Sequence, residues 1–305
     1  LIALAWVTCA APTLSFLAHQ FLVLLGLRVV YGLGLAMLWP SMVPVLMRWF
    51  PSKELPLVNA LNVAAFSAGI SLTTFTMAPL AQVIGWKVAF SLFGVASLVG
   101  AGVWVILGRV PGIVEESESH LSLRNLWKVL HARATLLLAF GDASVFAQYT
   151  ALTAWLPTFY FEVHGLSLNE AGATVGLLPI TGVFVVLLAG LLSLRFHRRR
   201  PFLIVSGVLA GLAGFGTFLL AGTVWVYTAL VLLSIGSWLY IPAFNTLLME
   251  LPDIRQEEAS VIFAVIIAVG GILTFVAPLV VGASADLLGT YVPGFAIFGI
   301  LAWGL

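Results

Sequence analysis

Residues 202–249 read FLIVSGVLAGLAGFGTFLLAGTVWVYTALVLLSIGSWLYIPAFNTLLM and contain no charged side chain. Other long charge-free stretches separate Lys87 from Arg109, Glu170 from Arg195 and Glu258 from Asp286. An α-helix needs about 20 mainly apolar residues to cross the hydrocarbon core of a bilayer, and each of these stretches is at least that long. They therefore predict membrane-spanning helices, two of them within residues 202–249.

The composition of the whole chain supports this prediction. Hydrophobic residues make up 62% of the 305 residues and charged residues only 8%. A soluble domain carries about 25% charged residues, because its surface must stay in contact with water. A membrane β-barrel is excluded because its strands alternate polar and apolar residues, whereas these apolar runs are continuous. We therefore expect an all-α, polytopic membrane protein.

Several classes of function find no support in the sequence. The net charge of +1 gives no electrostatic reason to bind nucleic acid. The single Cys9 and the five histidines show no spacing typical of metal ligands, and no Walker A sequence is present for ATP. The spans hold only one carboxylate and one guanidinium well inside them, too few for clustered catalytic groups. We expect no cofactor, no metal and no enzymatic activity.

The apolar runs between charged and turn-forming clusters predict about ten helices. Their expected ranges are Leu1–Leu17, Phe21–Met47, Leu57–Val83, Val88–Leu107, Ala134–Phe161, Ala171–Leu194, Phe202–Ala221, Val224–Met249, Ala259–Ala285 and Val292–Leu305. The long connection before Ala134 contains an amphipathic stretch, LSLRNLWKVLHARA, which predicts an interfacial helix.

The basic residues give the chain an orientation. In this map eleven of the 13 Lys and Arg residues fall on one side, Lys87 falls on the other, and Arg28 lies within a span. Cytoplasmic loops collect Lys and Arg, so the basic side is predicted to be cytoplasmic. We expect a multi-pass protein of the prokaryotic inner, or plasma, membrane.

An internal repeat suggests two related halves. A shift of 202 residues places Gly34 on Gly236, Pro40 on Pro242, Leu46 on Leu248 and Met47 on Met249. A shift of 199 places Ala78-Pro79-Leu80 on Ala277-Pro278-Leu279. The matches fall in corresponding helices of the same orientation, which is typical of a parallel repeat of two six-helix bundles.

The repeat predicts the domain organisation. Residues 1–109 are expected to form a truncated N-terminal bundle, helices 3 to 6 of 12, with the first two helices missing. Residues 110–133 are expected to form a cytoplasmic linker, and residues 134–305 a C-terminal bundle, helices 7 to 12, with the last helix cut.

Four passages resemble the major facilitator superfamily, and the resemblance covers the whole chain. Leu24, Arg28, Gly32, Gly34 and Ala36 reproduce the family's fourth-helix pattern, L-x-x-x-R-x-x-x-G-x-G-x-A. RWFPSKE at 48–54 looks like its cytoplasmic turn, and WLPTFYFEVHGLSLNEAG at 155–172 is similar to its junction between helices seven and eight. The resemblance implies a secondary active transporter built from two six-helix bundles.

The fourth passage is a cytoplasmic loop motif. Gly190, Arg195, Arg198 and Arg199 match the signature G-x-x-x-D-R-x-G-R-R, but Leu194 replaces its acidic residue and His197 its glycine. In the family that acid helps to latch the cytoplasmic side, so the latch is in doubt in this half. A simpler interpretation is that the arginines only anchor the helix on the cytoplasmic side.

Arg28 and Asp142 are the two ionisable side chains predicted to lie well inside spans. Each costs about 2.5–3.5 kcal/mol on insertion scales when it faces lipid, so both should face the protein interior or a wet cavity. By the resemblance, their helices line one central cavity. Arg28 would attract an anionic group or pair with an acid, and Asp142 would take up a coupling proton. The alternatives are a structural tie for Arg28 and snorkelling of Asp142 to the inner interface.

Polar and aromatic side chains on four helices complete the predicted translocation pathway. With Arg28 and Asp142, they are Tyr31, Asn62, Gln148, Tyr149, Trp238 and Asn245. For any single one of them, interhelical packing or hydrogen bonding is an alternative role. Pro242 is expected to kink its helix.

These observations favour a monomeric transporter that moves a small solute by alternating access. An organic or inorganic anion is the preferred substrate and a proton the preferred coupling ion. Efflux of a drug or metabolite is an alternative, and a non-transporting membrane sensor or scaffold is another.

Overall fold

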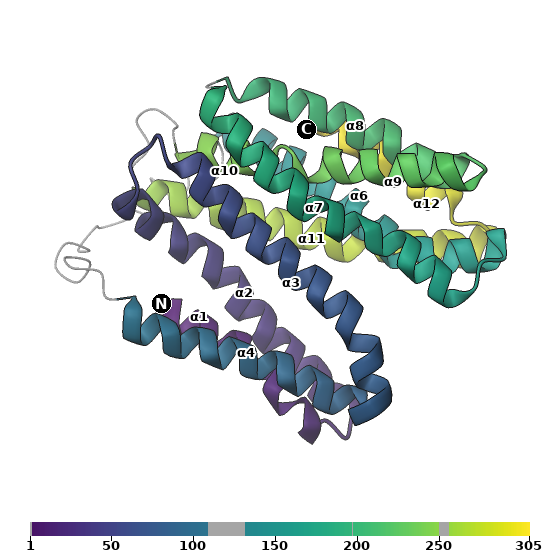
Figure 1. The fold of residues 1–305 in the computed structure, drawn as a ribbon, viewed down its shortest axis with the longest axis horizontal. Coiled ribbons are helices and arrows are strands. Elements are labelled where there is room, and N and C mark those ends of the chain that lie inside the picture. Colours follow the sequence, from purple (N-terminus) through teal and green to yellow (C-terminus); the bar gives the residue numbers. More distant parts are fainter. Residues whose placement is uncertain (1, 109–131, 197, 250–255) are drawn as a thin grey trace. The chain divides into compact units, whose positions relative to one another are not determined.

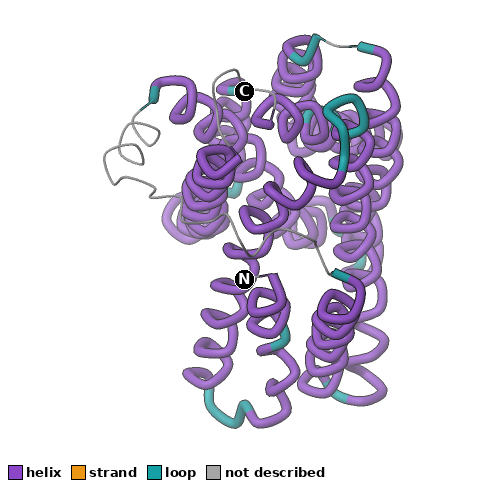
Figure 2. The backbone as a smooth tube through the Cα atoms, turned by 90° about the vertical axis from the view of Figure 1, so that its left-hand side faces the viewer, coloured by secondary structure: helices purple, strands orange, loops and turns teal. Residues whose placement is uncertain are grey.

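The computed structural model describes residues 2–108, 132–196, 198–249 and 256–305, and all of its elements there are helices (Figure 1). Short loops join most of these helices (Figure 2). The elements run α1 (Ile2–Cys9), η1 (Ala11–Leu17, a 3-10 helix), α2 (Phe21–Trp49), α3 (Leu55–Ile84), α4 (Trp86–Leu107), α6 (Arg133–His164), α7 (Leu168–Arg195), α8 (Arg200–Leu219), α9 (Thr223–Trp238), α10 (Ile241–Met249), α11 (Gln256–Leu288), α12 (Val292–Leu301) and η2 (Ala302–Gly304).

Most of the predicted spans agree with these helices to within a few residues, but Leu1–Leu17 is divided into α1 and η1, and Val224–Met249 into α9 and α10. Among the described residues, seven helices are long and apolar enough to cross a membrane, and two shorter apolar segments cover Ile2–Leu17 and Val292–Gly304. α6, which carries Asp142 and Gln148, is not among the seven. The protein is therefore an all-α, multi-pass membrane protein. The predicted interfacial helix falls outside the described residues.

The described residues group into two compact units. Unit 1 consists of the described residues within Leu1–Trp49, Leu72–Val129 and Ile254–Ala264. Unit 2 consists of those within Phe50–Ser71, Leu130–Asp253 and Val265–Leu305. The first half of α3 therefore belongs to unit 2, although it comes early in the chain. The predicted bundle boundaries, 1–109 and 134–305, stay a prediction.

Hydrogen bonds explain why α3 contributes to unit 2. Asn59 Nδ2 donates to Thr246 Oγ1 at 3.1 Å, and Ser67 Oγ donates to the carbonyl oxygen of Pro179 at 3.1 Å. Both donors are buried. In a bundle with little water, such interhelical bonds satisfy side chains that would otherwise be costly to bury.

Helix packing in unit 1 depends on a close approach of α2 to α1. A Cβ added at Gly34 on α2 would overlap Thr8 Oγ1 and lie 2.7 Å from the backbone nitrogen of Cys9. A residue with a side chain would clash at this contact, so glycine is required here. Such close backbone packing stabilises lipid-embedded helices.

The equivalent glycine of the repeat has the same role in unit 2. A Cβ at Gly236 on α9 would overlap the backbone nitrogen of Ala210 on α8 and lie 2.8 Å from its Cα. Gly34 and Gly236, 202 residues apart, therefore each mark the point where a helix presses on the helix that precedes it. The two glycines therefore have comparable packing, while the repeat of two bundles stays a prediction.

Two breaks in unit 2 follow from local sequence. α6 ends at His164 and is capped by Gly165, whose φ of 67° is left-handed. α7 is preceded by a capping box between Ser167 and Glu170. α9 and α10 are separated at Leu239 and Tyr240, just before Pro242. Proline lacks a donor N–H and clashes with the preceding turn, so the kink expected at Pro242 is confirmed as a break in the helix.

Candidate functional site

The most unusual group in unit 2 is the carboxyl of Asp142, on α6. Its side chain is only 9% exposed. Its Oδ1 accepts a hydrogen bond from Tyr240 Oη at 2.8 Å, and Tyr240 itself is fully buried. Because the carboxyl is enclosed within unit 2, its position argues against snorkelling to the membrane interface.

Tyr240 was not among the residues predicted from the sequence. It occupies the break between α9 and α10, and its ring packs edge-on against Phe244 at a centroid distance of 5.8 Å. A tyrosine two residues before a mid-span proline was the available signal, since a helix break re-aims the side chains beside it. Its partner lies 98 residues away, and nothing local in the sequence identifies that partner.

Gln148, six residues after Asp142 on α6, is fully buried. Its Nε2 donates to the carbonyl oxygen of Ala210 on α8 at 3.0 Å. Gly214 makes room for the amide, because a Cβ there would overlap Gln148 Nε2. The amide oxygen Oε1 has no hydrogen-bond partner among the described residues, nor does the buried Oγ of Ser237 on α9.

Tyr149 and Trp238, both predicted for the translocation pathway, contact each other. Their rings pack edge-to-face, with centroids 5.6 Å apart and an interplanar angle of 88°. Trp238 is buried and also lies against Gly182 of α7, where a Cβ would be 2.8 Å from its Nε1. This aromatic pair joins α6, α7 and α9 beside the polar groups of α6.

The two predicted asparagines occupy different surroundings. Asn62 on α3 is half-buried, and its Nδ2 donates to the carbonyl oxygen of Val58 in its own helix at 3.1 Å. Asn245 on α10 is 8% exposed, and the break at Tyr240 separates its helix from that of Trp238. Among the described residues, neither asparagine forms a hydrogen bond with Asp142, Tyr240 or Gln148.

Arg28 lies on α2, in unit 1. Its side chain is exposed, and its guanidinium carbon lies 4.4 Å from the centroid of the Phe90 ring on α4. This is the geometry of a cation–π contact, in which the positive charge lies over the face of the aromatic ring. Tyr31, one turn further on, is half-buried. Arg28 and Asp142 belong to separate units, so their facing a common pathway stays a prediction.

The loop motif after α7 divides into structural and exposed parts. Gly190 lies against the Cβ of Ala60 on α3. Arg199 is buried, and its Nη1 donates to the carbonyl oxygens of Ser193 at 2.8 Å and Phe196 at 3.2 Å. Arg195 and Arg198 are exposed, and His197 falls outside the described residues.

Comparison with known proteins places this arrangement in a family. The family model described as Major Facilitator Superfamily matches residues 1–278. The nitrite extrusion protein of Bacillus subtilis is 24% identical over 95% of this chain and 69% of its own length. A probable sulfoacetate transporter of Cupriavidus necator, SauU, is 26% identical over 99% of this chain and 75% of its own length.

A solved structure shows the same fold. The human organic anion transporter MFSD10 superposes with a TM-score of 0.74, covering 98% of this chain and 74% of its own. At 15% sequence identity, that likeness concerns the fold alone.

Proposed function

The chain belongs to the major facilitator superfamily, and from this premise we propose that it moves a small organic or inorganic anion across the membrane by alternating access. The chain is a transporter of small molecules, and the proposal adds the substrate class, the mechanism and the coupling ion. In this proposal the two repeated halves rock about a site near the middle of the membrane.

The names of the relatives support the choice of an anion. One is named for nitrite and another for sulfoacetate, both small anions. Arg28 offers an exposed guanidinium within a predicted span, which would attract such a group. In unit 2, the aromatic pair of Tyr149 and Trp238 would contribute a wall to the pathway.

The observation that carries the coupling proposal is the buried pair of Asp142 and Tyr240. A carboxyl inside a membrane protein is expensive, and such groups commonly take part in proton relays. A hydroxyl donor at 2.8 Å holds the carboxyl in place. In this proposal Asp142 takes up and releases the coupling proton, and Tyr240 positions it.

The experiment is uptake into proteoliposomes containing the purified protein. Nitrite and sulfoacetate are offered with and without an imposed proton gradient. We expect the gradient to drive accumulation of at least one anion, and Asp142→Asn to abolish that accumulation. Glu170→Gln is the matched control, because it removes an acid in an exposed capping box.

Each other result has a definite meaning. Gradient-driven uptake that persists in Asp142→Asn would overturn the coupling role. Transport of a cationic dye but of neither anion would favour drug efflux, and absence of any flux would favour a sensor or scaffold. We further propose that the protein acts as a monomer in a prokaryotic inner membrane. The molecular mass of the purified protein tests the first point, and cell fractionation tests the second.

A further inference from the structure

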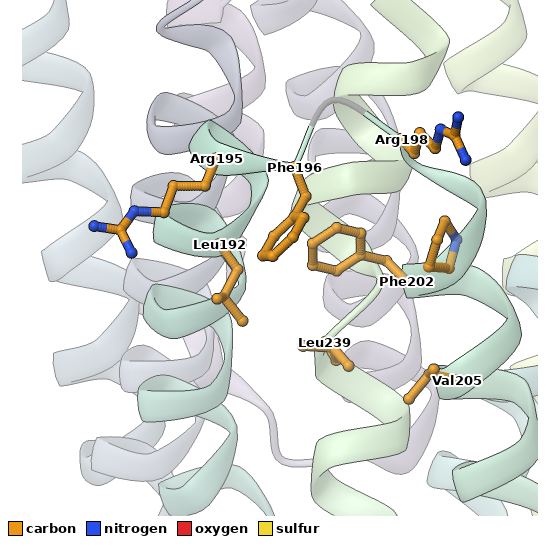
Figure 3. A pocket seen from close by; sticks show the side chains of 8 residues that line it. Leu192, Arg195, Phe196, Arg198, Phe202, Val205 and Leu239 are labelled. Carbon is orange, nitrogen blue, oxygen red and sulfur yellow. The ribbon is translucent and has the colours of Figure 1, made fainter.

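A pocket of about 530 Å³ lies at the end of α7 and the beginning of α8, within unit 2 (Figure 3). Leu192, Phe196, Phe202 and Leu239 form apolar walls, and Arg195 and Arg198 lie at its rim. In Figure 3 the rings of Phe196 and Phe202 lie together at the centre, while the two arginines extend to opposite sides. The pocket therefore combines an apolar interior with a positively charged rim.

Hydrogen bonds tie the beginning of α8 to the end of α7 beside this rim. Arg199 is buried and donates to two carbonyl oxygens near the end of α7, those of Ser193 and Phe196. A cation at a helix C-terminus also interacts favourably with the helix dipole. Arg199 therefore has a structural role at this helix end. Arg195 and Arg198 line the pocket, and both are exposed.

The chemistry of the pocket selects its occupant. Among the described residues that line it, two carry a positive charge and none carries a negative charge, so the electrostatics of the pocket favour a negatively charged group. The pocket also lies at the end of α7 that the distribution of basic residues predicts to be cytoplasmic. Basic pockets between transmembrane helices on that side bind phospholipid headgroups, and guanidinium matches phosphate geometry.

We propose that this pocket binds one anionic phospholipid of the cytoplasmic leaflet. The negatively charged headgroup lies at the rim, where the charges of Arg195 and Arg198 on either side attract it, and an acyl chain follows the apolar wall past Phe196 toward Leu239. This site goes beyond the proposed transport function. Through this site, the lipid composition of the membrane would affect the protein where α7 ends and α8 begins.

The test is native mass spectrometry of the detergent-purified protein, titrated with phosphatidylglycerol or with phosphatidylcholine of the same acyl chains. We expect phosphatidylglycerol to bind preferentially. The double variant Arg195→Gln/Arg198→Gln should bind it roughly thirtyfold more weakly, because a basic residue at an anionic lipid surface contributes about fivefold. Phe196→Ala, at a 57% exposed position, should also weaken binding.

The matched control is Arg133→Gln/Arg200→Gln, which removes the same charge from residues that do not line the pocket. Equal losses in both double variants would overturn the proposal, as would equal binding of the two lipids. Competition by glycerol phosphate as strong as by the whole lipid would assign the site to a free anion and also overturn it. None of these measurements depends on transport, so failure of the transport proposal would leave this test intact.

Discussion

The hydroxyl of Tyr240 provides the sharpest test of the buried carboxyl in unit 2. Tyr240→Phe removes the donor at 2.8 Å from Asp142 Oδ1 and leaves the ring in place against Phe244. Hydrogen bonds to a charged group contribute about 1.5–3 kcal/mol, and those between neutral groups about 1 kcal/mol. We therefore expect the variant to lose about 1 kcal/mol of unfolding free energy while Asp142 is protonated, and about 1.5–3 kcal/mol once it is ionised.

The sign of the pH dependence follows from the same bond. The carboxylate accepts a stronger hydrogen bond than the protonated acid, so the destabilisation by Tyr240→Phe should increase as the pH rises. Chemical unfolding in detergent at several pH values measures this difference. Gradient-driven uptake should show an altered pH profile in the same variant, because the donor no longer holds the proton-carrying group.

Tyr160→Phe is the control for this experiment. Tyr160 is equally buried, but its hydroxyl donates to the backbone carbonyl oxygen of Thr217 at 2.7 Å. That acceptor does not titrate, so its loss should cost about 1 kcal/mol at every pH. If the two variants showed the same destabilisation across the pH range and the same uptake profile, a special role for Tyr240 beside Asp142 would be refuted.

Three further predictions address packing, capping and substrate charge. Gly236→Ala should destabilise the protein by about 1–3 kcal/mol, because the added Cβ would clash with the backbone of Ala210. Gly271→Ala is the control: a Cβ there has nothing within 4 Å, so thermal unfolding should show a neutral or slightly stabilising effect. Ser167→Ala should cost about 1 kcal/mol through loss of the N-cap bond to Glu170, and an unchanged melting temperature would contradict this. Arg28→Gln should weaken anion uptake roughly tenfold or more in apparent affinity, since the change removes the charge that would attract the anion; equal affinity in the variant and the parent would exclude Arg28 from the pathway.

Helix positions followed from the sequence because the bilayer imposes them. A span needs an apolar run of fixed minimum length, and the chain supplies such runs between its few charges. The kink at Pro242 was also predicted, since it depends on the backbone chemistry of one residue. The cap at Ser167 was not predicted, although the local pattern Ser-x-x-Glu is typical of a capping box.

The sequence alone therefore determined an all-helical, membrane-spanning chain and identified Asp142 as an acid that is costly to bury. Only the tertiary structure decided that Tyr240 is its partner, that Gln148 bonds the backbone of α8, and that the first half of α3 belongs with unit 2. The reason is that helix period fixes which side chains share a face, whereas the rotation and approach of packed helices decide which of them meet. Those depend on small residues such as Gly214, whose missing side chain leaves no mark in the hydrophobic pattern.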